Sequence, residues 1–223
     1  MQITFALTDI DGAERLISDK LLAALEQYDR VLWIITGGSN IPVETAVMRG
    51  IGSADSGKLT IALSDERFGP LHHPESNWQQ LIAAGFEAKR ARVIPVLRPH
   101  MALRETCERY GAAFSEACLS ADKVVALLGM GADGHIAGIL PNSVALNAGK
   151  RWTVAYRTAE YTRITLTPFA LSHLSEAVLS AFGASKREQL ELLRDRRLAA
   201  ARQPAQLLKA IPKLTVINDQ IGE

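Results

Sequence analysis

The most specific chemical signal in this sequence is a glycine-lined segment that holds an aspartate and a histidine two residues apart. The segment runs from Gly129 to His135 (GMGADGH) and follows the apolar run KVVALL. A carboxylate at this spacing can orient an imidazole so that the imidazole acts as a general base. Asp133 and His135 are therefore candidate catalytic residues. The alternative is a histidine that only caps a buried turn.

The same glycines also match GxGxxG, a pattern that is typical of dinucleotide-binding loops when it follows a strand. That function needs a long helix directly after the glycines and an acidic residue at the end of the next strand. Here Pro141-Asn142 interrupts the chain within two turns, and the next apolar run, Trp152 to Tyr156, ends in Arg157-Thr158. We therefore reject a dinucleotide site.

A second glycine loop, Thr36 to Asn40 (TGGSN), follows the run VLWIIT and leads into a helix that we expect to begin near Pro42. Gly37 and Gly38 let the backbone curl and present N–H groups to an anion, and Ser39 adds a hydroxyl. The helix N-terminus adds its positive end. This loop is a candidate phosphate site, and the alternative is a tight strand-to-helix turn.

A third polar segment, SDERFG, follows the run LTIALS and contains Asp65 and Arg67. A carboxylate beside an arginine at a strand end can serve as a base and an anion clamp together, whereas the alternative is an ordinary surface ion pair. His72 and His73 come next in a proline-containing loop, without the helical or CxxC-type spacing of metal ligands. We expect no metal site there.

Two further cations stand at expected element boundaries. Arg163 opens the run RITLT, and Lys186 follows Gly183 within Ser185 to Glu188, which has the spacing of a capping box. The helix dipole disfavours a lysine in the first turn, so an anion shared between the helix N-terminus and the ammonium would explain its position. The alternative for both residues is a solvated surface charge.

Short β-branched runs alternate with segments of helical spacing, which predicts an α/β fold with three layers and a mostly parallel sheet covered by helices on both faces. In such a sheet ligands bind at the carboxyl ends of the strands, where these polar loops lie. The expected helices include 13–28, 102–119 and one capped by Thr167 before Pro168. The expected strands are Val31 to Thr36, Leu59 to Ser64, Val93 to Leu97, Lys123 to Leu128, Arg163 to Thr167 and Leu214 to Ile217.

Composition limits the class of protein. The chain has 223 residues, 48% of them hydrophobic, which suits one domain over 1–223. Lysine and arginine number 25 against 24 aspartates and glutamates, so we expect no nucleic-acid partner. We recognise neither a leader nor an apolar run long enough to span a bilayer, and Cys107 and Cys118 are too far apart on one helix to bond. We therefore expect a cytoplasmic protein with no membrane partner.

Taken in order, the motifs GGSNIP, SDERFGPLHHPESN, LLGMGADGHIAGILP and RITLT…GASKREQL resemble those of the 6-phosphogluconolactonase and glucosamine-6-phosphate isomerase superfamily over nearly the whole chain. The resemblance implies a Rossmann-like, NagB/RpiA-type fold and a small-molecule sugar phosphate as the partner, with no metal or organic cofactor. The positions that match phosphate-binding residues are Gly37, Gly38, Ser39, Arg163 and Lys186. Those that match the catalytic region are Asp65, Asp133 and His135, with Arg67 as a further anion contact.

Within this superfamily the resemblance favours hydrolysis of a phosphogluconolactone. The deaminating isomerases carry DEY rather than DER, and a glutamate at the position of Leu140. Loss of that carboxylate argues against proton shuttling in an isomerisation. The chain departs from the lactonase pattern at Asn40-Ile41-Pro42 and at Ile136, Gly138 and Leu140. A deaminating isomerase and a noncatalytic sugar-phosphate-binding module stay open as alternatives, as does the choice between a monomer and a small homo-oligomer.

Overall fold

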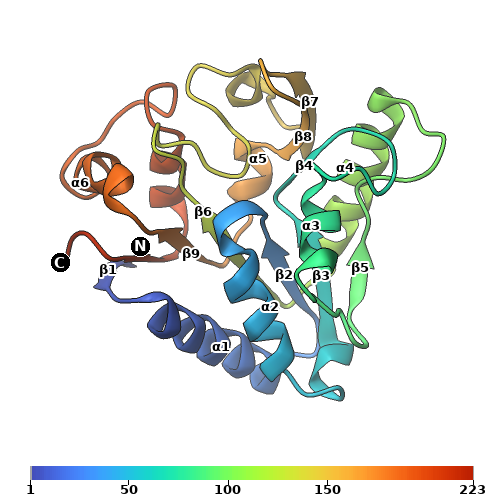
Figure 1. The fold of residues 1–223 in the computed structure, drawn as a ribbon, viewed down its shortest axis with the longest axis horizontal. Helices are drawn as coiled ribbons and strands as arrows, with labels where there is room; N and C mark the ends of the chain where they lie inside the picture. The colour runs from blue at the N-terminus through green and yellow to red at the C-terminus, as the bar shows by residue number, and fades with distance from the viewer. Residues whose placement is uncertain (1, 223) are drawn as a thin grey trace.

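The computed structural model describes residues 2–222 and is built around a sheet of seven parallel strands (Figure 1). Because both faces of such a sheet are covered, its strands are apolar along their length, and all five residues of the run VLWII are buried. In spatial order the strands are β1 (Gln2–Leu7), β10 (Lys213–Asn218), β9 (Glu176–Ala181), β6 (Lys123–Gly129), β2 (Val31–Ile35), β3 (Leu59–Leu63) and β5 (Arg92–Ile94).

Helices cover both faces of this sheet. The helices α1 (Ile10–Gln27), α2 (Ile41–Gly50) and α3 (Asn77–Ala83) follow one another across one face (Figure 1). The helices α4 (Leu103–Ser120), α5 (Pro168–Leu171) and α6 (Arg187–Asp195) belong to the other, as right-handed crossovers require. The side chains of β1 point to alternate faces and agree with this assignment. Thr4 lines a hollow on the face of α1, whereas Ile3 lines a hollow on the face of α6. The predicted three-layer α/β fold is confirmed.

A second, antiparallel sheet of three strands lies beside the first. It consists of β4 (Asp65–Arg67), β8 (Thr162–Leu166) and β7 (Thr153–Arg157), in that order. The chain passes from β3 to β4 through a single residue, Ser64, and so leaves the parallel sheet for the small one. The run RITLT is a strand as predicted, but it pairs with β4 rather than joining the parallel sheet.

Strands β1, β4, β7 and β9 are not among the six strands expected from the sequence. Strand β9 (EAVLSA) contains glutamate, serine and two alanines, which have weak strand propensity, although all six residues are buried. The predicted capping box is wrong: residues Ala184–Lys186 form a 3₁₀ turn, and α6 starts at Arg187 without a side-chain cap. The predicted cap before Pro168 is confirmed, because Thr167 Oγ1 accepts from the Ala170 amide at 3.2 Å.

The topology creates a crevice between β2 and β6. From β2 the chain proceeds to β3 through α2, on one face of the sheet, whereas from β6 it proceeds to β9 through α5, on the other. The two loops therefore diverge at their shared edge, and ligands of open α/β sheets bind at such a point. Among the described residues, no helix is long and apolar enough to cross a membrane.

A buried ion triad joins α1, β6 and β9 through their side chains. Glu176 accepts from Lys20 Nζ at 2.6 Å and from Lys123 Nζ at 2.9 Å. Burial raises the pKa of Glu176, but the hydrogen bonds and charges of the two lysines outweigh this effect and hold the pKa below its usual value. The carboxylate thus contributes stability above the pKa of an unfolded glutamate, about 4.3, and that contribution is lost as the pH falls through the lower folded pKa.

We predict that Glu176→Gln lowers the free energy of unfolding at pH 7 by about 2 kcal/mol, because two largely buried ammonium groups lose their charged partner. Urea denaturation at a series of pH values checks the sign. The difference between the wild type and the variant should shrink as the pH falls from about 5 to about 3. A difference that stays constant over this range would show that the ion triad is not its source.

Candidate active site

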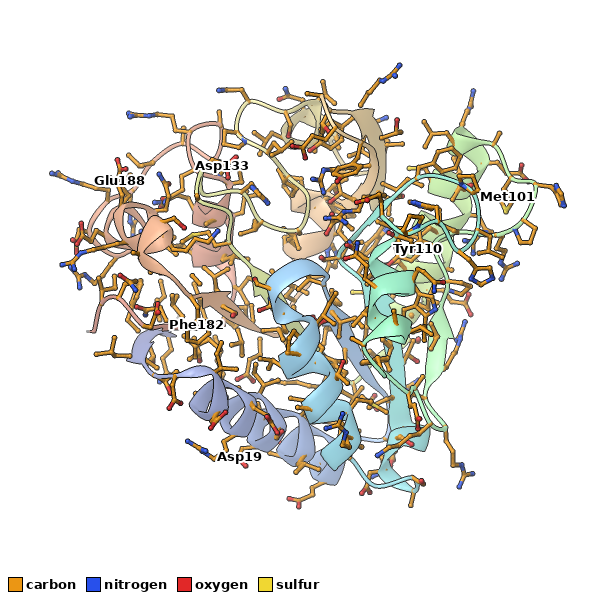
Figure 2. The ribbon with its side chains drawn as sticks, in the orientation of Figure 1. Asp19, Met101, Tyr110, Asp133, Phe182 and Glu188 are labelled. Carbon is orange, nitrogen blue, oxygen red and sulfur yellow. The ribbon has the colours of Figure 1, made fainter. Side chains whose placement is uncertain are left out.

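One cleft of about 250 Å³ opens at the carboxyl ends of the strands, where the loops after β2, β3, β6 and β9 meet. In Figure 2, Asp133 lies in the loop after β6, and Asp19 of α1 lies at the far end of the molecule. Of the nine predicted site residues, Asp133 alone is outside the cleft wall, beside His135. The eight that line the cleft are Gly37, Gly38, Ser39, Asp65, Arg67, His135, Arg163 and Lys186.

His135 and Asp133 form the contact that their spacing predicts. The ring nitrogen Nδ1 of His135 lies 2.6 Å from Asp133 Oδ1, and the His135 amide donates to the same oxygen at 3.1 Å. Burial raises the pKa of Asp133, but the hydrogen bonds and charge of His135 outweigh it and lower the pKa. An ionised Asp133 accepts the proton of Nδ1, which leaves Nε2 as the basic nitrogen of the ring.

Glycines make this arrangement possible. The Gly131 amide donates to the His135 carbonyl at 2.9 Å, so the chain folds back on itself within five residues. A Cβ atom at Gly131 would collide with the imidazole of His135, and Gly134 has a φ of 80°. No α-helix lies within residues 130–152, so the glycines lack the helix that a dinucleotide-binding loop requires. The GxGxxG pattern reflects a tight turn around the histidine.

A glutamine network holds this turn from outside the cleft. The amide of Ala205 donates to the Gly134 carbonyl at 3.0 Å. Gln203 donates from Nε2 to the Gln189 carbonyl at 2.7 Å, and Gln206 donates to Gln203 Oε1 at 2.6 Å. The proline-containing segment near residue 204 therefore connects α6 to the loop that carries His135.

Asp65 forms an ion pair rather than a free carboxylate. Its Oδ2 lies 3.1 Å from Arg163 Nη1, and the two side chains are 7% and 12% exposed. Gly138 packs against it, since a Cβ atom there would stand 2.7 Å from the same oxygen. A carboxylate engaged in this way positions the arginine. A direct catalytic role for Asp65 stays a prediction.

Sequence analysis missed the role of Glu66, which is 1% exposed. Its carboxylate accepts from the amides of Asn77 (2.6 Å), Arg67 (2.7 Å) and Trp78 (3.1 Å) and from Ser76 Oγ (2.9 Å). Burial raises the pKa of Glu66, and these hydrogen bonds oppose the rise. Glu66 thereby fixes the start of α3 against β4.

Asn77 is a further lining residue that the predictions omitted. Its Nδ2 donates to the Asp65 carbonyl at 2.8 Å, and its Oδ1 is buried without a partner among the described residues. The side chain also packs on Gly37, where a Cβ atom would collide with the amide group. The sequence does contain a signal for Asn77, because Ser76-Asn77 closes the segment SDERFGPLHHPESN, one of the motifs on which the family resemblance rests.

The glycine loop after β2 has the form expected of an anion site. Gly38 has a φ of 66° and begins a 3₁₀ turn that leads into α2 at Ile41. Below the loop, the fully buried Glu44 accepts from the Thr36 amide at 2.7 Å. Burial raises the pKa of Glu44 well above its usual value, against the effect of that hydrogen bond. Burial thus disfavours the charged form of a carboxyl group that lies beneath a candidate anion site.

The charged side chains of the cleft are predominantly cationic. Arg67, Arg163 and Lys186 stand against one carboxylate in the lining, Asp65. Arg67 and Arg163 each have a buried Nε without a partner, and Lys186 makes no ion pair with another described residue. A phosphate dianion would suit this excess of positive charge.

The two adjacent histidines have separate structural partners. His72 Nδ1 lies 3.1 Å from Gln79 Oε1, and His73 Nε2 lies 2.9 Å from the Arg67 carbonyl. Over residues 2–222, no three or more histidine, cysteine, aspartate or glutamate side chains gather where they could hold a metal ion.

The sequence of this chain is similar to those of known proteins. Residues 9–216 match the model of a family described as glucosamine-6-phosphate isomerases/6-phosphogluconolactonase. A 6-phosphogluconolactonase from Rhizobium meliloti is 31% identical over 199 residues, which cover 83% of this chain and 80% of the relative. Another from Pseudomonas aeruginosa is 33% identical over 134 residues, which cover 59% of this chain and only 55% of that protein.

Solved structures agree in fold. The crystal structure of a 6-phosphogluconolactonase from Thermotoga maritima superposes with a TM-score of 0.81 at 23% identity, covering 97% of this chain and 99% of that one. A 6-phosphogluconolactonase from Trypanosoma brucei gives a TM-score of 0.77 at 19% identity, covering 98% and 97%. Since the family match extends over residues 9–216, the chain belongs to the glucosamine-6-phosphate isomerase/6-phosphogluconolactonase family.

Proposed function

We propose that this chain is an enzyme that hydrolyses 6-phospho-D-glucono-1,5-lactone to 6-phosphogluconate. The observation that carries the proposal is that one cleft contains both a group of three cations and the imidazole of His135, with Asp133 on its Nδ1. The cations suit a phosphate and the imidazole suits the activation of water. The names of the relatives support the choice of substrate.

In this proposal the phosphate lies at the glycine loop after β2. The N–H groups at the start of the turn, the hydroxyl of Ser39 and the positive end of α2 would receive it. Lys186 would contact it from the β9 side, and Arg67 and Arg163 from the small sheet. Binding at these groups would hold the ring of the substrate toward His135.

In the same cleft, His135 would act first as a base and then as an acid. Nε2 takes a proton from a water molecule while the water oxygen bonds to the lactone carbonyl carbon. Backbone N–H groups of the glycine loops would stabilise the resulting oxyanion. The bond between that carbon and the ring oxygen then breaks, and the ring oxygen takes the proton from Nε2. The sequence of steps releases one open-chain acid and needs no organic cofactor.

Leu140 supports hydrolysis over isomerisation. Its side chain lines a depression on the other side of His135, together with Glu160 from the exposed turn between β7 and β8. The resemblance assigns a glutamate to the Leu140 position in the deaminating isomerases. An alkyl side chain cannot move the protons that aldose–ketose isomerisation requires there.

We predict that the wild type accelerates acid release from freshly generated 6-phosphoglucono-1,5-lactone above the spontaneous rate, and that His135→Ala lowers kcat by about 10² or more. Affinity for 6-phosphogluconate should change little, because the cations stay in place. A pH-stat assay measures the rate and calorimetry measures the affinity. If kcat is unchanged in the variant, His135 is not the general base.

We predict that Lys186→Ala raises KM by about tenfold or more, consistent with about 1.5–3 kcal/mol for a hydrogen bond to a charged group, and lowers kcat less than His135→Ala does. Arg187→Ala, which removes a neighbouring cation that pairs with Glu191 on the surface, is the matched control and should leave KM unchanged.

Two outcomes would point to the other functions. Ammonia release from glucosamine 6-phosphate would identify a deaminating isomerase. A thermal shift that saturates with 6-phosphogluconate, without hydrolysis of the lactone, would identify a noncatalytic binding module.

A further inference from the structure

Two arginines of the cleft lie directly opposite each other across the β4–β8 pair. Arg67 pairs in register with Arg163, so both side chains project from the same face of the small sheet. Like charges in this arrangement repel each other, and the pair requires a group that stabilises it. Asp65 supplies one negative charge to Arg163. Arg67 has no carboxylate partner within ion-pair distance in the described part of the chain.

The ring of Tyr161 contacts both guanidinium groups. Cζ of Arg67 lies 5.2 Å from the ring centroid and Cζ of Arg163 lies 5.5 Å from it. Both distances fall within the range in which the negative face of an aromatic ring attracts a cation. Tyr161 lies just before β8, two residues ahead of Arg163, and its ring reaches both guanidinium groups from there. A single ring thus attracts two cations that would otherwise repel each other.

The hydroxyl of Tyr161 connects the ring to the loop before α3. Its Oη donates to Glu75 Oε2 at 3.0 Å, and the Glu75 carbonyl accepts from Arg67 Nη1 at 2.9 Å. The backbone of Tyr161 is held as well, since its carbonyl accepts from the Thr158 amide at 2.7 Å. Tyr161, which contacts both arginines, therefore connects the turn between β7 and β8 to the loop before α3.

We propose that Tyr161 is a positioning residue that holds Arg67 and Arg163 converged in the cleft before the phosphorylated substrate binds. The proposal rests on the proposed function for the identity of that substrate. The free Nε groups of both arginines are buried, so their orientation is set by contacts within the protein rather than by water. Ordering two long side chains in advance removes a cost that binding would otherwise bear.

The experiment compares Tyr161→Leu with Tyr161→Phe, which keeps the ring and loses only the hydroxyl. Tyr161→Leu should weaken binding of 6-phosphogluconate about five- to tenfold and raise KM by a similar factor, with kcat within about twofold, as expected for one or two cation–π contacts. Tyr161→Phe should stay within about threefold of the wild type. Tyr28→Leu, at the end of α1 just before β2 and thus on the side of the amino ends of the strands, is the matched control and should change neither value.

A double-mutant cycle with Arg67→Ala separates positioning from a general effect on folding. If Tyr161 acts through Arg67, Tyr161→Leu should weaken binding less than about threefold in the Arg67→Ala background. Equal losses in both backgrounds, or a fall in melting temperature with unchanged affinity, would overturn the proposal. A wild type that binds 6-phosphogluconate without hydrolysing the lactone would refute the hydrolase alone, whereas a wild type that binds no 6-phosphogluconate would refute both.

Discussion

A buried ion pair between Asp65 and Arg163 links two neighbouring strands of the small sheet at the cleft. Asp65 begins β4, directly after the chain leaves the parallel sheet, and Arg163 comes from the adjacent strand β8. Removing two charges from water is costly, so the pair is tolerated only because neighbouring groups complete it. Ser64 Oγ lies 3.2 Å from the carboxylate, and Gly138 leaves room for it. The pair therefore holds an arginine of the cleft next to the point where the chain leaves the parallel sheet, and Gly138 brings the loop after β6 against the same carboxylate.

Burial, as well as pairing with a charged partner, affects the ionisation of carboxyl groups near the cleft. Glu44 lies beneath the glycine loop, where an ionised carboxylate would weaken any phosphate site. Burial raises its pKa and so disfavours that charge. The pKa of Asp133 shifts in the opposite direction, because the hydrogen bonds and charge of His135 lower it and keep the carboxylate ionised. The pKa values of two carboxyl groups close to one site thus shift in opposite directions, and each direction suits the position of the group.

The sequence allowed the prediction of residues whose role depends on local pattern. The run KVVALL before GMGADGH located His135 at a strand end, and the glycines indicated a curled loop. Glu66 and Tyr161 could not be predicted in this way. Glu66 looks like one charge of a polar DER segment, and its role arises only because the start of α3 returns to it from eleven residues later. Tyr161 acts across a strand pair whose register the sequence did not determine.

Two of the departures from the lactonase pattern, Asn40 and Ile136, lie in the interior of the loops. Ile136 is fully buried within the loop and bridges to Met130 and Ile139, so it packs the turn beneath the imidazole. Asn40 is also buried, with its Nδ2 toward Gly129, which places it between the two glycine loops. Neither Asn40 nor Ile136 is among the residues that line the cleft. These two departures therefore change the interior of the loops rather than the surface that a ligand would contact.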